Sequence, residues 1–390
     1  MSTEDIVARI ADGIAGIAAE DWDRCAGRAN PFLSHAFLSS LEESGSAVAR
    51  TGWQPVPVVI HGPDGRAAAV LPAYAKSHSQ GEYVFDHGWA EAYARAGGDY
   101  YPKLQIAVPF TPVPGRRLLA ADPAFAPQLI AAAEALVRGN GLSSAHATFI
   151  AEDEVPLFEA AGWLIRIDSQ FHWHNQGYAS FDDFLATLSS RKRKTIRKER
   201  ASAIEGLTIE HVTGAALGER HWDAFWDFYQ DTGSRKWGRP YLTRRFFSLI
   251  GEHMADRILL ILALRGGRPI AGALNLIGED CLYGRYWGCT QDVPHLHFEL
   301  CYYQAIEAAI SRGLRRVEAG AQGSHKLARG YRPVPTWSAH YIPDPNFRRA
   351  VADFLAAERR AVTNEIAALD EMTPFRKPEA GSRKPEESDF

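Results

Sequence analysis

The stretch Ile258-Leu-Leu-Ile-Leu-Ala-Leu-Arg-Gly-Gly-Arg-Pro-Ile-Ala-Gly-Ala-Leu-Asn-Leu-Ile277 contains two apolar runs separated by Arg265–Arg268. Glycine supplies the positive φ that tight hairpin turns need, so this stretch predicts a β-hairpin. Much earlier in the chain, Pro57–Ile60, the turn His61–Gly65 and Arg66–Leu71 repeat the pattern. The two hairpins therefore predict a chain that contains one module twice.

Each hairpin is followed by matching apolar segments. We expect a third strand near Glu82–Phe85 in the first half and near Leu282–Trp287 in the second. Further along, each half offers a helix and another strand, at 125–137 and 145–150 in the first half and at 296–310 and 316–319 in the second. Helices, an antiparallel meander, a helix and a further strand together predict a mixed α/β (α+β) fold.

The repeat divides the chain into five expected parts. They are an N-terminal domain at residues 1–174 with an insertion at 87–117, a basic linker at 175–204, a C-terminal domain at 205–345, a helix at 346–373 and a disordered tail at 374–390. The prolines of Val108–Gly115 forbid a helix, so the insertion should include a rigid extended loop. Isoleucines at helical spacing predict a short amphipathic helix within residues 1–20.

Composition limits the partners and the compartment. Lys and Arg number 43 against 47 Asp and Glu, for a net charge of −4, so a basic function must be local. No apolar run is long enough to span a bilayer, and no integral membrane segment is expected. Four cysteines without a C-x-x-C pair argue against a disulfide framework and favour a reducing cytoplasm.

One strong cluster of charge stands out, at Ser190–Arg200, with seven basic residues and one acidic residue. Arginine offers a bidentate fork and lysine a point charge for phosphate, so we expect Arg193, Lys194 and Arg197 to bind substrate phosphate groups. A nucleotide diphosphate, a tRNA acceptor end and the phosphates of CoA are all ligands that such a basic surface could bind. The alternative is a solvated helix start.

A second candidate site is the small-residue loop at 319–334, which follows a predicted strand. It concentrates Gln322, His325, Lys326 and Arg329 among glycines, which allow a ligand to approach the backbone closely. The alternative is a mobile loop without function. On the strand expected near Leu282–Trp287, the residues Tyr283, Arg285 and Trp287 alternate and should share one face beside the substrate, unless that face packs on a helix.

The sequence motifs that could bind a metal or carry acid–base chemistry are weak signals of a site. The pairs His172-x-His174 and His295-x-His297 lack a third ligand at motif spacing, so a structural role is expected and no metal site is assigned. Asp86 and His87 are adjacent, and adjacent side chains rarely point together.

Three segments carry a family resemblance: Tyr83–Tyr93, Tyr100–Pro112 and Gly320–Tyr331. They resemble the signature segments of the FemAB-like predicted N-acyltransferases, which are related to the peptidoglycan-bridge aminoacyltransferases in the GNAT superfamily. The resemblance implies tandem GNAT-like domains with a cleft between or beside them. It also implies catalytic roles for Lys326, which matches a family lysine, and for the adjacent His325, and it adds Lys103 to the substrate-binding residues.

The implied activity is transfer of an acyl or aminoacyl group to an amine, on a small molecule or a muropeptide. The donor is aminoacyl-tRNA or acyl-CoA, and no tightly bound cofactor is expected. Gly288–Leu296 lacks the glycines of the usual CoA pyrophosphate loop, and no long helical arm for tRNA is found, so the donor stays open. The alternative is a non-catalytic protein that binds a cell-wall precursor or nucleic acid on the same scaffold.

Overall fold

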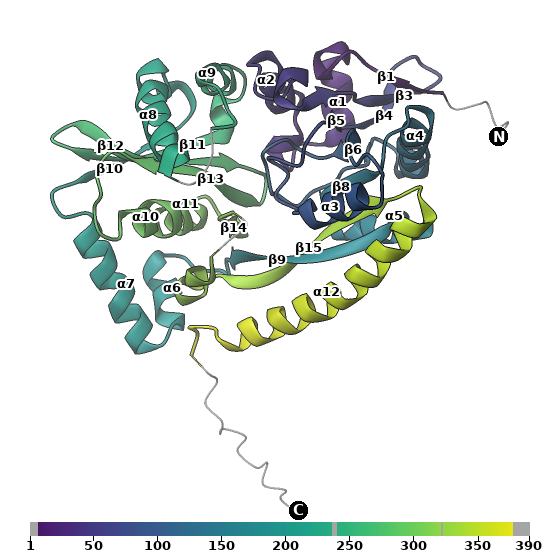
Figure 1. Ribbon diagram of the computed structural model, residues 1–390. Helices are drawn as coiled ribbons and strands as arrows, with labels where there is room; N and C mark the ends of the chain where they lie inside the picture. Colours follow the sequence, from purple (N-terminus) through teal and green to yellow (C-terminus); the bar gives the residue numbers. More distant parts are fainter. Residues whose placement is uncertain (1–6, 236–239, 321–322, 377–390) are drawn as a thin grey trace, which may run out of the picture.

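The computed structural model describes residues 7–235, 240–320 and 323–376 (Figure 1). Within these residues the strands form two sheets. A four-stranded sheet has the order β1-β3-β4-β7, and an eleven-stranded sheet has the order β10-β11-β12-β13-β14-β9-β15-β8-β6-β5-β2. The larger sheet runs through both halves of the chain.

The strands are β1 (Ala8–Ile10), β2 (Trp53–Pro55), β3 (Val58–His61), β4 (Ala67–Leu71), β5 (Ala73–Lys76), β6 (Lys103–Ile106), β7 (Leu119–Ala120), β8 (Ala145–Ile150), β9 (Leu164–His174), β10 (Thr208–Val212), β11 (Ile258–Arg265), β12 (Arg268–Ile277), β13 (Cys281–Cys289), β14 (Arg316–Glu318) and β15 (Arg332–Tyr341). The α-helices are α1 (Ala19–Ala26), α2 (His35–Glu43), α3 (His87–Arg95), α4 (Ala126–Gly139), α5 (Val155–Ala160), α6 (Phe181–Thr187), α7 (Ser190–Ala203), α8 (Glu219–Arg235), α9 (Arg244–His253), α10 (Leu296–Phe298), α11 (Gln304–Ser311) and α12 (Pro345–Glu371). A π-helical turn, η8 (Glu299–Tyr303), joins α10 to α11.

Both predicted hairpins are present, as the antiparallel pairs β3–β4 and β11–β12. Strand β11 is apolar from Ile258 to Leu264 because both of its faces are buried there. Leu260 and Leu262 join one hydrophobic core, and Leu259 and Ile261 join another on the opposite face. Helices α8 and α9 lie over the first face, and α10 and α11 lie over the second (Figure 1). Burying each such side chain contributes roughly 1.5–3 kcal/mol.

The two halves repeat one order of elements. In the first, β6 pairs with β8 in parallel and α4 comes between them in the chain. In the second, β13 pairs with β14 in parallel and α11 comes between them. The predicted mixed α/β fold with a duplicated module is therefore confirmed.

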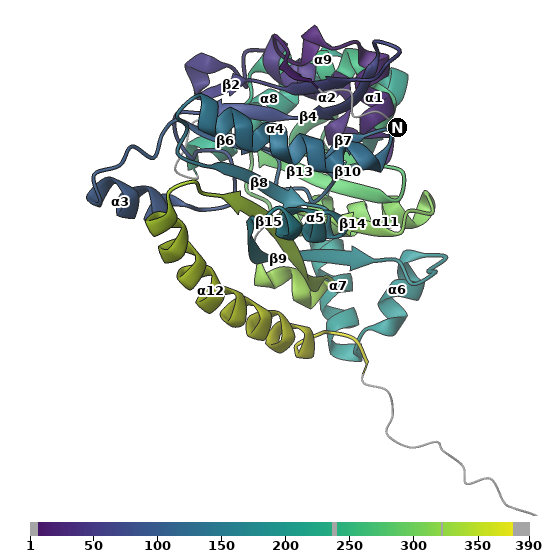
Figure 2. The same ribbon diagram turned by 90° about the vertical axis from the view of Figure 1, so that its right-hand side faces the viewer.

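The last strands of the two halves are exchanged. Strand β9 leaves the first half and pairs with β14 of the second half, while β15 of the second half returns to pair with β8 of the first. Strands β9 and β15 also pair with each other. Helix α12 then runs along this exchanged pair as a long strap (Figures 1 and 2). The exchange makes the eleven-stranded sheet continuous.

Two expected elements differ in the structure. The third strand of the first half is β5, whereas the predicted strand Glu82–Phe85 is irregular, with Tyr83 at φ 61°. The predicted N-terminal helix is wrong over the described residues: Ala8–Ile10 form β1, and α1 begins at Ala19. Strand β1 forms because its backbone pairs with β3 at the edge of the small sheet.

The segments expected as insertion, linker and tail are built as follows. Residues 87–117 contain α3 and β6 as well as an irregular proline-rich loop. The basic segment forms α6 and α7. At the start of the tail, Phe375 forms a bridge with Leu188, and residues 377–390 lie outside the described residues. None of the helices in the described part of the chain has the length and apolarity required to span a bilayer.

Candidate functional site

The parallel strands β13 and β14 separate in the C-terminal half. They pair from Cys281 to Tyr283 and from Arg316 to Glu318, after which β14 ends while β13 continues to Cys289. Gly284 lies where they part, and a Cβ there would be 3.4 Å from the carbonyl oxygen of Glu318. The chain that leaves β14 here carries the 3-10 helix η9 (Ser324–Arg329), which contains Lys326.

Lys326 is buried, with 1% of the residue exposed. Its Nζ donates to the carbonyl oxygen of Gly320 across 2.7 Å and lies 6.0 Å from the centre of the Phe171 ring. An ammonium has three N–H donors, and no carboxylate among the described residues pairs with it. Burial lowers the pKa of Lys326 to about 8. This arrangement leaves donors available for an anionic or polarised oxygen.

The other residues of η9 anchor it. Arg329 donates to both carboxylate oxygens of Glu199 on α7, at 2.9 and 3.1 Å, and its guanidinium lies 3.5 Å from the centre of the Phe298 ring. His325 is exposed, and its Nε2 lies 2.9 Å from the hydroxyl of Tyr302. The structure thus brings the predicted loop and the predicted basic run together through Glu199. Gln322 lies outside the described residues.

The basic run forms helix α7, and its arginines differ in role. Arg200 pairs with the fully buried Glu299 at 2.9 Å and with Glu307 at 2.7 Å. Arg197 is exposed and pairs with Asp182 at 2.8 Å. Arg193 is half-buried, Lys194 is exposed, and neither has an ion-pair partner among the residues that the structure describes.

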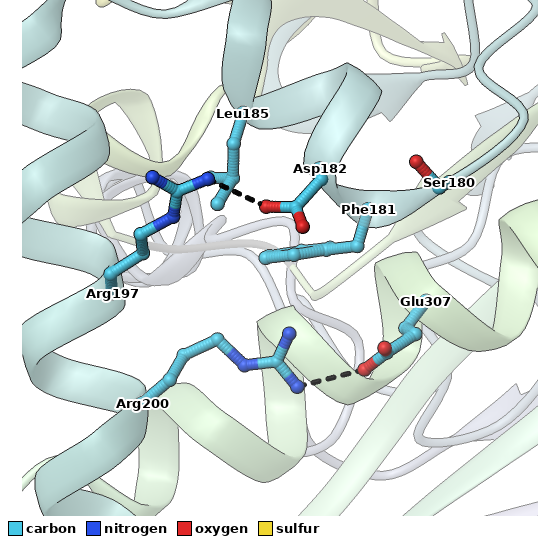
Figure 3. A pocket seen from close by; sticks show the side chains of 7 residues that line it. All are labelled: Ser180, Phe181, Asp182, Leu185, Arg197, Arg200 and Glu307. Carbon is cyan, nitrogen blue, oxygen red and sulfur yellow. Dashed lines mark hydrogen bonds and ion pairs between the residues drawn. The ribbon is translucent and has the colours of Figure 1, made fainter.

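An open pocket of about 290 Å³ lies between α6, α7 and α11 (Figure 3). Its lining residues are Ser180, Phe181, Asp182, Leu185, Arg197, Arg200 and Glu307. The ring of Phe181 lies between the two ion pairs, Arg197–Asp182 and Arg200–Glu307, so each arginine here already has a carboxylate (Figure 3). The pocket walls are therefore balanced in charge.

The predicted common face of Tyr283, Arg285 and Trp287 is wrong. The register of β12 and β13 shifts between Leu274 and Asn275, which makes Arg285 an extra, bulged residue. A bulge reverses the alternation that follows it. Tyr283 therefore packs in the core that faces the N-terminal half, whereas Trp287 packs on the other face, 5.3 Å from the His297 ring.

The proline-rich loop of the first half reaches this part of the sheet. Arg285 donates to the carbonyl oxygen of Phe110 across 2.6 Å, and Gln170 of β9 donates to the carbonyl oxygen of Pro112 across 2.8 Å. The ring of Phe110 stacks on Tyr241 at 4.9 Å. These contacts place the loop against the strands that carry the site.

Lys103 lies elsewhere, in the core of the first half. It is fully buried, and its Nζ donates to Ser79 at 2.9 Å, to Glu82 at 2.7 Å and to Asp86. Three acceptors use its three donors. Burial raises the pKa of Glu82 to about 7. The sequence offered Asp86 and His87 as a weak acid–base pair, but Asp86 instead accepts from Lys103 and, at 2.7 Å, from the hydroxyl of Tyr100.

Sequence reasoning missed one group, Glu318 at the end of β14. It is 4% exposed, its Oε1 accepts from Arg316 Nε at 3.1 Å, and its Oε2 lies 3.9 Å from His172 Nε2 on β9. Burial raises the pKa of Glu318 to about 7 and lowers that of His172 to about 3. Only the pairing of two predicted strands could have identified Glu318, and a single sequence does not reveal which strands pair.

Comparison with solved structures supports the fold. The crystal structure of FemX matches with a TM-score of 0.54 at 11% identity, covering 86% of this chain and 98% of that chain. The C-terminal domain of a putative lysylphosphatidylglycerol synthetase from Agrobacterium fabrum matches with a TM-score of 0.52 at 12% identity, covering 86% and 96%. A conserved protein of unknown function from Bacteroides thetaiotaomicron VPI-5482 gives 0.51 at 11% identity, covering 86% and 100%.

No curated protein matches the chain. The FemAB-like family model, described as peptidoglycan biosynthesis/recognition, matches residues 13–377. This range includes both halves, the exchanged strands and all three signature segments. The chain therefore belongs to the FemAB-like family.

Proposed function

We propose that this protein is an N-acyltransferase that forms an amide bond between an acyl or aminoacyl donor and an amine acceptor. The observation that carries the proposal is the buried Lys326 at the point where β13 and β14 separate, with no carboxylate partner among the described residues. When an amine attacks a carbonyl carbon, negative charge develops on the carbonyl oxygen. A preorganised ammonium in a site that excludes water stabilises that charge.

The surrounding residues have supporting roles. Arg329 holds η9 against α7 through Glu199, so it positions Lys326. His325 borders Lys326 on the exposed side of η9 and is proposed to contact the reacting groups. Arg193 and Lys194, without ion-pair partners in the described part of α7, are proposed to bind donor phosphates, with Arg197 and Gln322 as further contacts.

Donor and acceptor follow from the family and the charge. The donor is aminoacyl-tRNA or acyl-CoA, both of which present phosphates to a basic helix. The acceptor is an amine of a small molecule or of a muropeptide, in line with the family description. No dedicated nucleophile is required, because positioning and electrostatic stabilisation supply much of the rate.

The family description also names recognition, which favours a second candidate, a binding protein without turnover. Purified protein is incubated with an amine acceptor, either a muropeptide amine or a small amine. Each reaction also contains one donor, either acyl-CoA or aminoacyl-tRNA. Mass spectrometry then measures the amide product. Product that depends on Lys326 supports the transferase; tight binding of the muropeptide without product from either donor supports the binding protein.

A further inference from the structure

Glu318 and His172 lie where three strands meet. Strand β9 pairs with β14 up to Glu318, which lies opposite His172, and with β15 from Arg332, which also lies opposite His172. The chain that carries Lys326 leaves the sheet between these two pairings. The two side chains are therefore fixed at the base of η9 by the sheet itself.

One carboxylate oxygen of Glu318 has no hydrogen-bond partner among the described residues. Its Oε1 accepts from Arg316, while its Oε2 is buried and has no hydrogen-bond partner among the described residues. The 3.9 Å from Oε2 to His172 Nε2 is too long for a hydrogen bond. The partner of His172 Nε2 is instead Gln170 Oε1 on the same strand, at 3.4 Å. A buried, unpartnered carboxylate oxygen is costly unless something binds it.

The charges around Glu318 suit a cation. On its own strand, Arg316 pairs with both Glu318 and Asp280, so one positive charge faces two negative ones. From β13 the neighbouring titratable groups are the buried Cys281 and Tyr283, whose pKa values burial raises, so both stay neutral. From β9 the neighbours are His172 and His174, whose pKa values burial lowers. Arg316 is therefore shared between two carboxylates, which leaves Glu318 only partly neutralised, and Lys326 is a second cation that acts on the neighbouring His172.

We propose that Glu318 binds the acceptor amine and takes its proton, making it the general base of the reaction. This inference rests on the proposed N-acyltransferase function. In this proposal the two reactants bind side chains of opposite charge. The amine binds the Glu318 carboxylate, and the donor carbonyl oxygen binds the Lys326 ammonium.

The proton and electron balance is complete. The acceptor arrives as an ammonium and gives one proton to the Glu318 carboxylate. The free amine attacks the donor carbonyl carbon, a C–N bond forms, and the bond from that carbon to the leaving sulfur or oxygen breaks. The second proton of the nitrogen leaves with the thiol or hydroxyl, and Glu318 returns its own proton to solvent. A base with a pKa near 7 suits this step at neutral pH.

The test compares Glu318→Gln with wild type, using a strongly basic amine and a weakly basic amine that is already neutral at pH 7. With the strongly basic amine, we expect kcat to fall about 10²–10⁴-fold and the rise in rate through pH 7 to disappear. With the weakly basic amine, which needs no base before attack, the loss should be much smaller. A purely structural role would lower both rates equally.

Two controls keep the result clear. Glu154→Gln removes another buried carboxyl, held by backbone amides of Arg117 and Leu118, and should leave the pH profile unchanged. If Glu318→Gln fails to fold, Glu318→Asp, which retains the carboxylate, should keep the dependence on pH near 7 at a lower kcat. Equal losses for both amines, or an unchanged rate, would overturn the role of Glu318 alone. No transfer by wild type from either donor would overturn the proposed function and this inference with it.

Discussion

The ammonium of Lys103 donates to the carboxylate of Glu82 across 2.7 Å in the interior of the N-terminal half, where both side chains are out of contact with solvent. Asp86 accepts from the same ammonium. Strand β6 is thereby fixed to the irregular segment that precedes α3. The cluster lies three strands away from β9 in the sheet, through β15 and β8.

Replacing Lys103 by Met should therefore act on stability. The change leaves the buried Asp86 carboxylate without its cation and leaves Glu82 with only the 3.8 Å pair to Lys76, and removing one partner of a buried pair typically costs about 3–5 kcal/mol. Urea unfolding measures the free energy of unfolding. Lys194→Met, at an exposed position without an ion pair in the described residues, is the matched control and should stay within about 0.5 kcal/mol of wild type. Equal stability of the two variants would show that the cluster does not stabilise the fold.

Lys326→Ala should fold normally and lose about 10²–10³-fold in transfer rate, the usual effect of removing one oxyanion donor. Lys326→Arg should restore only part of the rate, because its planar fork places charge differently from a point ammonium. Burial lowers the pKa of Lys326 to about 8, so the ammonium is lost, and the rate falls, as pH rises through 8. Wild-type turnover in Lys326→Ala, with Lys198→Ala as the exposed control, would remove Lys326 from the mechanism.

Arg193 and Lys194 should control the salt dependence of donor binding. Changing both to Gln removes two contacts to phosphate, so affinity should fall and its dependence on salt should flatten. Titrations of donor at several salt concentrations measure both effects. The double variant Arg349→Gln and Arg360→Gln removes the same charge from exposed positions on α12 and should bind as wild type does. Equal behaviour of the two double variants would identify the basic run as a solvated helix face.

Arg200 should matter for stability far more than its neighbour Arg197. Arg200→Met leaves the fully buried carboxylate of Glu299, in the π-helical turn, without its cation, at a cost of about 3–5 kcal/mol. Arg197→Met breaks an exposed pair with Asp182, worth at most about 1 kcal/mol. Thermal unfolding of both variants makes the comparison. A larger loss for Arg197→Met would contradict the assigned roles.

The sequence was sufficient for features encoded locally. The hairpins, α4, α8 and α9 follow from apolar spacing and turn glycines, because each is decided within a few residues. The loop with Lys326 was found for the same reason: its glycines and charges are contiguous in sequence.

Features that depend on distant pairing could not be predicted. The bulge at Arg285 arises from the register against β12, so strict alternation gave the wrong face for Trp287. The partners of Lys103 come from a separate segment, and its burial cannot be read from the residues beside it. Glu318 became visible as a candidate only when the sheet placed it opposite His172.

The exchange of β9 and β15 has a consequence for synthesis of the chain. The N-terminal half is made first, yet the strand that covers the edge of β8 ends at Tyr341, close to the end of the described chain. During translation, β8 therefore exposes unpaired backbone groups until the chain has been made at least as far as Tyr341. Pairings of such long sequence separation form slowly. A fragment that ends after residue 174 lacks the strand that covers β8 and should aggregate, so neither half of this fold is expected to be stable when it is expressed without the other.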